Sequence, residues 1–259
     1  MDSDILSARE LRRYSKQIMI PEIGIEGQEK LKKSRVLVVG AGGLGCPVLQ
    51  YLAAAGIGKI GIADFDMVDE TNLQRQVLYG SSDVGKLKSI LAKSALEHIN
   101  SLIEFEIFNL RVDASNSLEI FKDFDVIVDA TDNLDARYII NDSCVILDKP
   151  MVHGSIYKYE GMISVFNFNG GPTYRCYNPF VSVTEFKNPS PSAIGLFGVL
   201  PGIAGTYMAN EVIKIITKTG DILSGKVLLI NILDNTFNHF SVSNVPENHN
   251  IKTLKRVTD

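Results

Sequence analysis

Residues 36–46 read Val-Leu-Val-Val-Gly-Ala-Gly-Gly-Leu-Gly-Cys, and this stretch decides the fold. A run of β-branched and apolar residues, which favours a strand, stops at Gly40, and a helical pattern begins near Leu44. Between them, Gly40, Gly42 and Gly45 have the spacing Gly-x-Gly-x-x-Gly of a strand–turn–helix nucleotide site. The first glycine permits a tight turn, the second lets the backbone approach a phosphate, and the third lets the helix pack closely. We therefore expect an anion to bind at the helix N-terminus, where N–H groups are unpaired.

An acidic residue supports this interpretation. Asp64 ends the next apolar run, Ile60-Gly-Ile-Ala-Asp64, 19 residues after Gly45. In dinucleotide-binding folds an acid at this distance binds the ribose hydroxyls. A glycine pattern alone occurs in many plain turns, but here the strand, the helix and the acid stand in the required order. The sequence predicts an α/β fold with a Rossmann-like doubly wound sheet.

Composition limits the possible functions. The chain has 259 residues, 45% of them hydrophobic, and a net charge of −4 without a block of basic residues. We expect no nucleic-acid partner, because there is no basic block, and no membrane, because no apolar run reaches the roughly 18 residues that span a bilayer. The acidic start, residues 1–4, does not resemble a secretory signal. Three cysteines without paired spacing, Cys46, Cys144 and Cys176, favour a reduced, cytoplasmic setting.

The hydrophobic pattern changes along the chain. We predict a single domain, 1–259, with an N-terminal helical region (1–34) and a parallel, nucleotide-binding half (35–150). Alternating runs then indicate an antiparallel half (151–243) with a long crossover loop (170–192), followed by a polar, loose tail (244–259). Gly24 and Gly27 are expected to interrupt the N-terminal region. The predicted helices are 5–17, 28–33, 44–56, 88–100, 117–121, 134–147 and 201–217, and the predicted strands are 36–39, 59–64, 103–108, 125–129, 151–157, 161–168, 226–233 and 237–242.

Polar groups follow two of the predicted strands. Residues 64–76 and 130–133 both lie at the carboxyl edge of the sheet, where ligands of open α/β sheets bind. These groups belong to a set of six segments with a characteristic order and spacing. The segments are Arg13-Tyr-Ser-Lys-Gln17, Gly40–Gly45, Asp64-Phe-Asp66, Asn72-Leu-Gln-Arg-Gln76, Gly85-Lys-Leu-Lys88 and Asp129-Ala-Thr-Asp-Asn133.

Together these segments resemble the adenylating enzymes of the ubiquitin-activating superfamily, in the MoeB/ThiF/HesA branch, over residues 9–243. The resemblance implies that the chain uses ATP and magnesium to adenylate the C-terminal Gly-Gly carboxylate of a ubiquitin-like sulfur carrier, in molybdopterin or thiamine biosynthesis. The residue types suit that reaction. A C-terminal carboxylate has a pKa near roughly 3.5 and is already ionised, so the site needs positive charge and positioning rather than a general base.

The resemblance also implies a role for each site residue. Lys88 would stabilise the pentavalent phosphorus and Arg75 would grip the triphosphate, while Asp132 would hold the magnesium ion. Asp64 would bind the ribose, Asn72 would support the nucleotide, Gly43 would lie where the backbone passes the phosphates together with Gly40 and Gly42, and Asp66 would lie nearby. Each side chain also has a purely structural interpretation: a surface ion pair for Arg75, an exposed helix lysine for Lys88, an N-cap for Asp132 and Asn133, and a turn for Asp64. Their joint position at strand ends and helix starts favours one shared site.

Three departures from the family pattern stand out. In the motif Arg-Tyr-x-Arg-Gln the second arginine serves the ATP site of the partner subunit, and here it is Lys16, which keeps the charge but not the planar fork. The resemblance thus implies a homodimer with a weaker γ-phosphate contact. Of the two Cys-x-x-Cys pairs that bind zinc in relatives, the first is reduced to Thr173 and Cys176, and the second, at 245–249, has no cysteine. We therefore predict no zinc.

The third departure concerns covalent catalysis. The crossover-loop position that carries a cysteine in some relatives is Pro191 here, so we expect adenylation without a thioester on this loop. Cys46 and Cys144 are expected to be core residues, and the four histidines are assigned no chemistry. Two other functions fit part of the pattern: a nucleotide-binding scaffold that has lost turnover, and an NAD-dependent oxidoreductase, which would leave Arg75 and Lys88 without a role.

Overall fold

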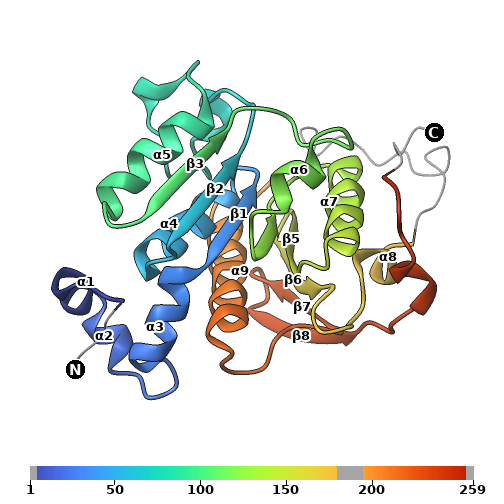
Figure 1. Ribbon diagram of the computed structural model, residues 1–259. Helices are drawn as coiled ribbons and strands as arrows, with labels where there is room; N and C mark the ends of the chain where they lie inside the picture. Colours follow the sequence, from blue (N-terminus) through green and yellow to red (C-terminus); the bar gives the residue numbers. More distant parts are fainter. Residues whose placement is uncertain (1–4, 180–194, 255–259) are drawn as a thin grey trace.

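An eight-stranded mixed sheet forms the centre of the protein in a computed structural model, which describes residues 5–179 and 195–254 (Figure 1). The strand order is β3-β2-β1-β4-β5-β6-β7-β8. Neighbouring strands are parallel from β3 to β5 and antiparallel from β5 to β8. This arrangement confirms the predicted fold class. The strands are β1 (Arg35–Val39), β2 (Lys59–Ala63), β3 (Glu104–Phe108), β4 (Val126–Asp129), β5 (Met151–Tyr157), β6 (Glu160–Phe166), β7 (Lys226–Asn231) and β8 (Thr236–Ser241).

Helices cover both faces of this sheet. On one face α4, α5 and α9 pack over a core that includes Val36, Val38 and Met208. On the other face α6 and α7 pack over Leu37 and Ile127. Successive residues of β1 thus enter opposite cores, which explains why the strand is apolar from Val36 to Val39. The helices are α1 (Ala8–Arg13), α2 (Ser15–Ile18), α3 (Gly24–Lys33), α4 (Gly45–Ala55), α5 (Lys88–Ile99), α6 (Ser117–Phe121), α7 (Leu134–Ile146), α8 (Tyr174–Tyr177) and α9 (Leu200–Thr217).

The topology creates a switch point between β1 and β4. From β1 the chain proceeds to β2 and β3 on one side, and then crosses back to β4 on the other side of β1. In open α/β sheets ligands bind at the carboxyl ends of the strands at such a switch point. The glycine turn after β1 and the segment 130–133 after β4 both lie there, as the sequence predicts.

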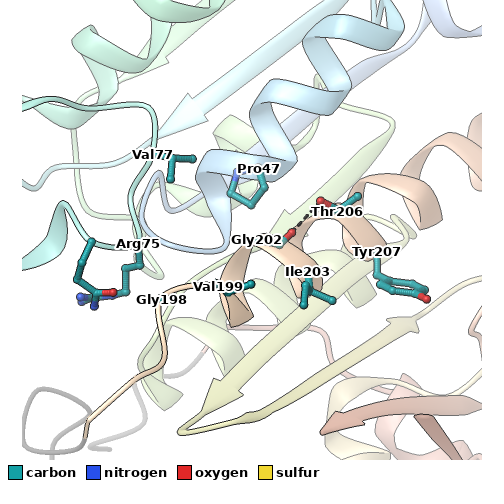
Figure 2. Close-up of a pocket in the computed structure, with 10 residues that line it drawn as sticks. Pro47, Arg75, Val77, Gly198, Val199, Gly202, Ile203, Thr206 and Tyr207 are labelled. Carbon is teal, nitrogen blue, oxygen red and sulfur yellow. Dashed lines mark hydrogen bonds between the residues drawn. The ribbon is translucent and has the colours of Figure 1, made fainter. Parts of the chain in front are cut away.

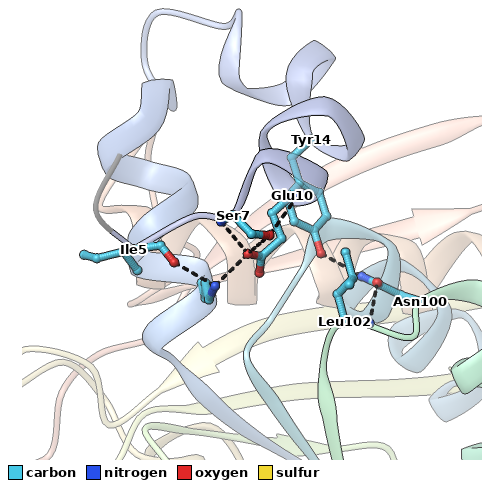
Figure 3. Close-up of polar contacts among 7 residues, drawn as sticks. Ile5, Ser7, Glu10, Tyr14, Asn100 and Leu102 are labelled. Atoms are coloured by element: carbon cyan, nitrogen blue, oxygen red, sulfur yellow. Dashed lines mark hydrogen bonds and ion pairs between the residues drawn. The ribbon is translucent and has the colours of Figure 1, made fainter. Parts of the chain in front are cut away.

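The N-terminal region differs from the single helix predicted over residues 5–17. It contains two short helices, α1 and α2, separated at Tyr14. Figure 3 shows the Tyr14 side chain beside Asn100: its hydroxyl accepts a hydrogen bond of 2.8 Å from Nδ2 of Asn100. Helix α1 begins with a capping box between Ser7 and Glu10, and the buried Glu10 carboxylate also pairs with Lys32 at 2.6 Å.

Other local predictions also need correction. Gly27 does not interrupt a helix, because α3 runs through it from Gly24 to Lys33. The predicted crossover loop 170–192 contains α8, and its residues 180–192, including Pro191, lie outside the described part of the chain. The predicted loose tail contains a 3₁₀ turn at Pro246–His249. Among the described residues, no helix is both long and apolar enough to cross a membrane.

Candidate nucleotide site

The glycine turn connects the end of β1 to the start of α4, and two of its positions have no room for a side chain. A Cβ atom on Gly45 would lie 1.9 Å from the carbonyl oxygen of Gly40. Gly40 itself has a φ of +97°, and a Cβ there would lie 2.7 Å from the carbonyl oxygen of Ala130. At Gly42 the nearest atom to such a Cβ would be Nε2 of Gln76, at 3.5 Å. Gly40 and Gly45 are therefore closely packed against backbone atoms, whereas Gly42 has room for a ligand to approach its backbone.

Asp64 holds this turn in place. The carboxylate follows β2, is buried, and accepts a hydrogen bond of 2.7 Å from the backbone N–H of Ala41 and one of 2.8 Å from that of Asp66. Burial raises the pKa of Asp64, although both hydrogen bonds act to lower it. Each carboxylate oxygen retains acceptor capacity beyond its backbone partner. Asp64 thus shapes the glycine turn and can still accept hydrogen bonds from ribose hydroxyls.

Lys88 is the first residue of α5 and is only 5% exposed. Its ammonium nitrogen lies 3.2 Å from Oδ2 of Asp66, and its backbone N–H donates to the Asp66 carbonyl oxygen at 2.9 Å. The Asp66 side chain is about half exposed. A buried ammonium group requires an anionic partner, so a phosphate that approached this edge could join Asp66 or replace it.

Arg75 lies in the loop between β2 and α5. One of its terminal nitrogens donates to Oδ1 of Asn72 at 2.7 Å, and the other donates to the carbonyl oxygen of Thr71 at 3.2 Å. The aliphatic part of Arg75 passes beside the glycine turn, because a Cβ on Gly43 would lie 3.6 Å from its Cγ. Asn72 therefore orients Arg75, whose aliphatic part lies beside Gly43.

Asp132 lies in the turn between β4 and α7 and is exposed. Asn133, not Asp132, caps α7, since its side chain accepts a hydrogen bond from the N–H of Ala136 at 2.9 Å. The contact of Ala130 with Gly40 places this turn against the glycine turn. Asp132 therefore lies at the same edge of the sheet as Asp64 and Lys88, without a capping role.

Lys16 lies apart from these residues within one chain. It is exposed on α2, and its neighbour Gln17 donates to the carbonyl oxygen of Ala55 at the C-terminal end of α4. Arg13 contacts the carbonyl oxygen of Ile99 at the C-terminal end of α5. Because α4 and α5 each extend for about 16–18 Å, Lys16 and the glycine turn lie at opposite ends of these helices.

Two residues near the glycine turn were not assigned a role from the sequence. Tyr79 is buried and donates its hydroxyl proton to the carbonyl oxygen of Ala41 at 2.8 Å, so Ala41 is held by Tyr79 and by Asp64. Gln76 is also buried beside Gly42, and its Oε1 has no hydrogen-bond partner among the described residues. Gln76 belongs to the segment quoted for the resemblance, whereas nothing in the local pattern distinguishes Tyr79.

A cavity of about 680 Å³ adjoins the site (Figure 2). Its walls come from the start of α4, the start of α9 and the loop that carries Arg75, with Pro47 and Ile203 on facing sides. Neither Lys88 nor Asp132 lines it. The cavity is mainly apolar and shares only Arg75 with the predicted site.

The cysteines lie in two kinds of environment. Cys46 and Cys144 are buried core residues, and burial raises the pKa of Cys46 to about 12. Around Cys176, burial acts to raise the thiol pKa, but hydrogen bonds from its neighbours outweigh it and lower the pKa. Those neighbours include the backbone N–H of Val245 at 3.4 Å and Nδ2 of Asn248 at 3.5 Å. One thiol among N–H donors does not supply the four ligands of a structural zinc site.

The fold and the site define a class of protein: a doubly wound nucleotide-binding domain with fixed cations beside its glycine turn. The chain belongs to the ThiF family, whose model matches residues 14–251.

Three curated relatives are similar over most of the chain. A sulfur carrier protein adenylyltransferase of Thermus thermophilus is 44% identical over 248 residues, which cover 92% of this chain and 89% of the relative. A probable molybdopterin-synthase adenylyltransferase of Porphyra purpurea is 46% identical over 236 residues, covering 91% of this chain and 62% of the relative. The adenylyltransferase and sulfurtransferase MOCS3 of Aedes aegypti is 46% identical over 244 residues, covering 92% of this chain and 54% of the relative. The chain thus spans only 62% and 54% of the lengths of the last two relatives.

Solved structures share the fold. The crystal structure of E. coli MccB with ATP has a TM-score of 0.80 and 24% identity, covering 95% of this chain and 75% of that one. The structure of PaaA also has a TM-score of 0.80, with 25% identity over 95% of this chain and 77% of that one. These likenesses support the observed fold.

Proposed function

We propose that this protein is an ATP-dependent adenylyltransferase that activates the C-terminal Gly-Gly carboxylate of a ubiquitin-like sulfur-carrier protein, of the molybdopterin or thiamine pathway type. The observation that carries the proposal is the pair of oriented cations at the glycine turn: Lys88 held by Asp66 and Arg75 held by Asn72. The relatives named as adenylyltransferases in Thermus and Porphyra support the same reaction. We assign the activity to one ThiF-like domain, residues 1–259, acting in the cytoplasm.

The proposed reaction joins two anions. A carboxylate oxygen of the carrier attacks the α-phosphorus of ATP, a new P–O bond forms, and the bond to the β-phosphate oxygen breaks with release of pyrophosphate. The carboxylate is ionised at neutral pH, so no side chain has to remove a proton. Lys88 and Arg75 would lower the electrostatic barrier, because they are already fixed and need little reorganisation when charge develops on the phosphates. Asp64 would hold the ribose, with the phosphates along Gly40, Gly42 and Gly43.

Asp132 is the residue we propose for magnesium. Proteins commonly bind this ion through one or two carboxylates, with substrate phosphates and water completing the shell. A single exposed carboxylate beside the glycine turn fits that requirement, and the described residues contain no cluster of three or more His, Cys, Asp or Glu side chains that could form a complete protein site. When bound, the ion would neutralise charge on the departing pyrophosphate.

We also propose a homodimer. Within one chain, Lys16 and the site residues lie at opposite ends of α4 and α5, so Lys16 could reach ATP only from a second copy. Lysine supplies a point charge without the bidentate geometry of arginine, so we propose a weaker contact with the γ-phosphate than arginine would give.

The two alternatives have less support. An oxidoreductase would use the glycine turn and Asp64 but would give Arg75 and Lys88 no function, and the curated relatives reported above are named as adenylyltransferases. A scaffold without turnover would retain ATP binding but release no pyrophosphate. The experiment below separates it from the enzyme.

The test combines the protein with ATP, magnesium and each available Gly-Gly-ended carrier, and measures pyrophosphate release and the carrier's mass. We expect the mass of one AMP group to be added to the matching carrier, and not to that carrier without its last glycine. Lys88→Met should abolish this product. Lys86→Met is the matched control, because Lys86 is exposed and pairs with Asp83, away from Asp66. Equal product from both variants, or no adenylate on any carrier, would refute the proposed enzyme.

A further inference from the structure

The carboxylate of Asp129 lies fully buried at the end of β4, three residues before Asp132. Its Oδ1 accepts hydrogen bonds from the N–H of Thr131 at 3.0 Å and from the Thr131 hydroxyl at 2.6 Å. Its Oδ2 accepts a hydrogen bond of 2.7 Å from Nδ1 of His153. Burial acts to raise the pKa of Asp129, but these donors outweigh it and the pKa is lowered, so the carboxylate is ionised at neutral pH.

His153 comes from the neighbouring strand, β5, where it stands directly opposite Asp129 in the parallel register. The ring is 0% exposed and is enclosed by Tyr174, with ring centroids 5.0 Å apart, and by Phe166, at 5.9 Å. Burial lowers the pKa of His153, so the ring is neutral. Because Nδ1 faces a carboxylate, Nδ1 carries the single ring proton, while Nε2 has no hydrogen-bond partner among the described residues.

Thr131 connects this buried pair to the nucleotide site. Besides its two hydrogen bonds to Asp129, its carbonyl oxygen accepts a hydrogen bond of 3.2 Å from Arg137. Asp132 is the next residue, and its side chain does not cap α7, because Asn133 does so. The glycine turn, by contrast, has its own supports, since Asp64 and Tyr79 hold Ala41.

We propose that His153 is a positioning residue for magnesium-dependent ATP binding: its Nδ1–H holds the Asp129 carboxylate, Asp129 holds Thr131, and Thr131 orients the Asp132 carboxylate. The inference rests on the proposed function of Asp132. The magnesium carboxylate and the glycine turn should therefore respond differently to the loss of this hydrogen bond. Loss of the His153 hydrogen bond should disturb the magnesium carboxylate and leave the glycine turn in place. His153 itself touches neither ATP nor metal.

Two amide substitutions distinguish the ring nitrogens. In His153→Asn, the side-chain N–H₂ lies near the position of Nδ1 and can still donate to Asp129. In His153→Gln, the longer side chain places it near the position of Nε2, away from Asp129. The two variants are similar in polarity, so a difference between them reports the hydrogen bond to Asp129 rather than the loss of the imidazole ring.

The measurement is the affinity for α,β-methylene-ATP by calorimetry, with and without magnesium. In His153→Gln we expect the tightening of binding by magnesium to fall about tenfold, as for the loss of one charge-assisted hydrogen bond, with magnesium-free affinity within about twofold of wild type. His153→Asn should retain the wild-type magnesium effect. Equal magnesium effects in the two variants, or an equal loss without magnesium, would overturn the proposal.

A third variant covers the case in which His153→Gln does not fold. Thr131→Val keeps the side-chain shape but removes the hydroxyl donor to Asp129, and should reproduce the weakened magnesium effect. A wild-type magnesium effect in Thr131→Val would overturn the proposed connection. These binding measurements need no carrier protein. A failure to adenylate any carrier would therefore refute the proposed function separately, without affecting the comparison of variants.

Discussion

The close approach of Gly45 to Gly40 gives the sharpest test of the glycine turn. In Gly45→Ala, the new Cβ would lie 1.9 Å from the Gly40 carbonyl oxygen, where a real contact needs at least about 3 Å. Neither atom belongs to a flexible side chain, so the start of α4 has to move away from the turn by about 1 Å. Overpacking of this kind costs about 1–3 kcal/mol. For a domain of this size, that loss corresponds to a fall in Tm of about 2–12 °C.

The same displacement should weaken nucleotide binding. The N–H groups that are expected to face the phosphates belong to the turn and the first residues of α4, and a misplacement of about 1 Å can reduce activity by about 100-fold. We expect the affinity of Gly45→Ala for α,β-methylene-ATP, measured by calorimetry, to fall at least tenfold. Thermal unfolding of the same samples gives the change in Tm.

Gly202→Ala is the matched control. Gly202 also lies in the first turn of a long helix, α9, but apart from its chain neighbours and the backbone of its own helix no described atom lies within 4 Å of the Cβ position there. Alanine favours a helix over glycine by up to about 1 kcal/mol, so Tm should stay constant or rise slightly, with unchanged affinity. If Gly45→Ala matched Gly202→Ala in both Tm and affinity, our account of the turn would be wrong.

Three further results are expected. Burial raises the pKa of the Cys46 thiol to about 12 in the folded state, whereas the thiol ionises near pH 9 in the unfolded chain. The free energy of unfolding should therefore fall between pH 9 and 12 by up to roughly 4 kcal/mol. Denaturant titrations of Cys46→Ala should lack that part of the loss. Arg175→Ala removes both 2.7 Å hydrogen bonds to the buried Asp142 carboxylate and should cost about 3–5 kcal/mol, seen as a large fall in Tm; an unchanged Tm would contradict the importance of this ion pair. If Lys16 acts across a homodimer, Lys16→Ala and Lys88→Met chains are each inactive, but half of the dimers in an equal mixture become mixed dimers with one intact site. Pyrophosphate release should then recover to about a quarter of the wild-type rate after subunit exchange. A site within one chain predicts no recovery.

The sequence predicted most of the fold because its signals are local. Strand β1, the glycine turn and α4 follow from the spacing of apolar residues and glycines within 36–56. The change of period after residue 150 likewise predicted the antiparallel half. Asp64 was found in the same way, because its position after β2 is fixed by the length of one helix and one strand.

Features that depend on distant contacts were missed. The helix is interrupted at Tyr14, whose hydroxyl accepts a hydrogen bond from Asn100, 86 positions away, and no helical pattern within 5–17 reveals this contact. The pairing of His153 with Asp129 depends on the register between β4 and β5, so a solitary histidine in an apolar run gave no signal. Tyr79 was missed for the same reason: its partner, Ala41, lies 38 positions earlier, in the turn after β1, whereas Tyr79 lies in the loop after β2.

The central claim is that a carboxylate oxygen of the carrier attacks the α-phosphorus of ATP at the site of Lys88 and Arg75. Oxygen-18 in both oxygens of the carrier's C-terminal carboxylate tests this most directly. After adenylation, hydroxylamine cleaves the adenylate at its carbonyl carbon, and the released AMP is analysed by mass spectrometry. We expect one oxygen-18 atom in each AMP, and no AMP at all when the protein carries Lys88→Met. AMP without the label would contradict it, since the carboxylate would then not have attacked phosphorus.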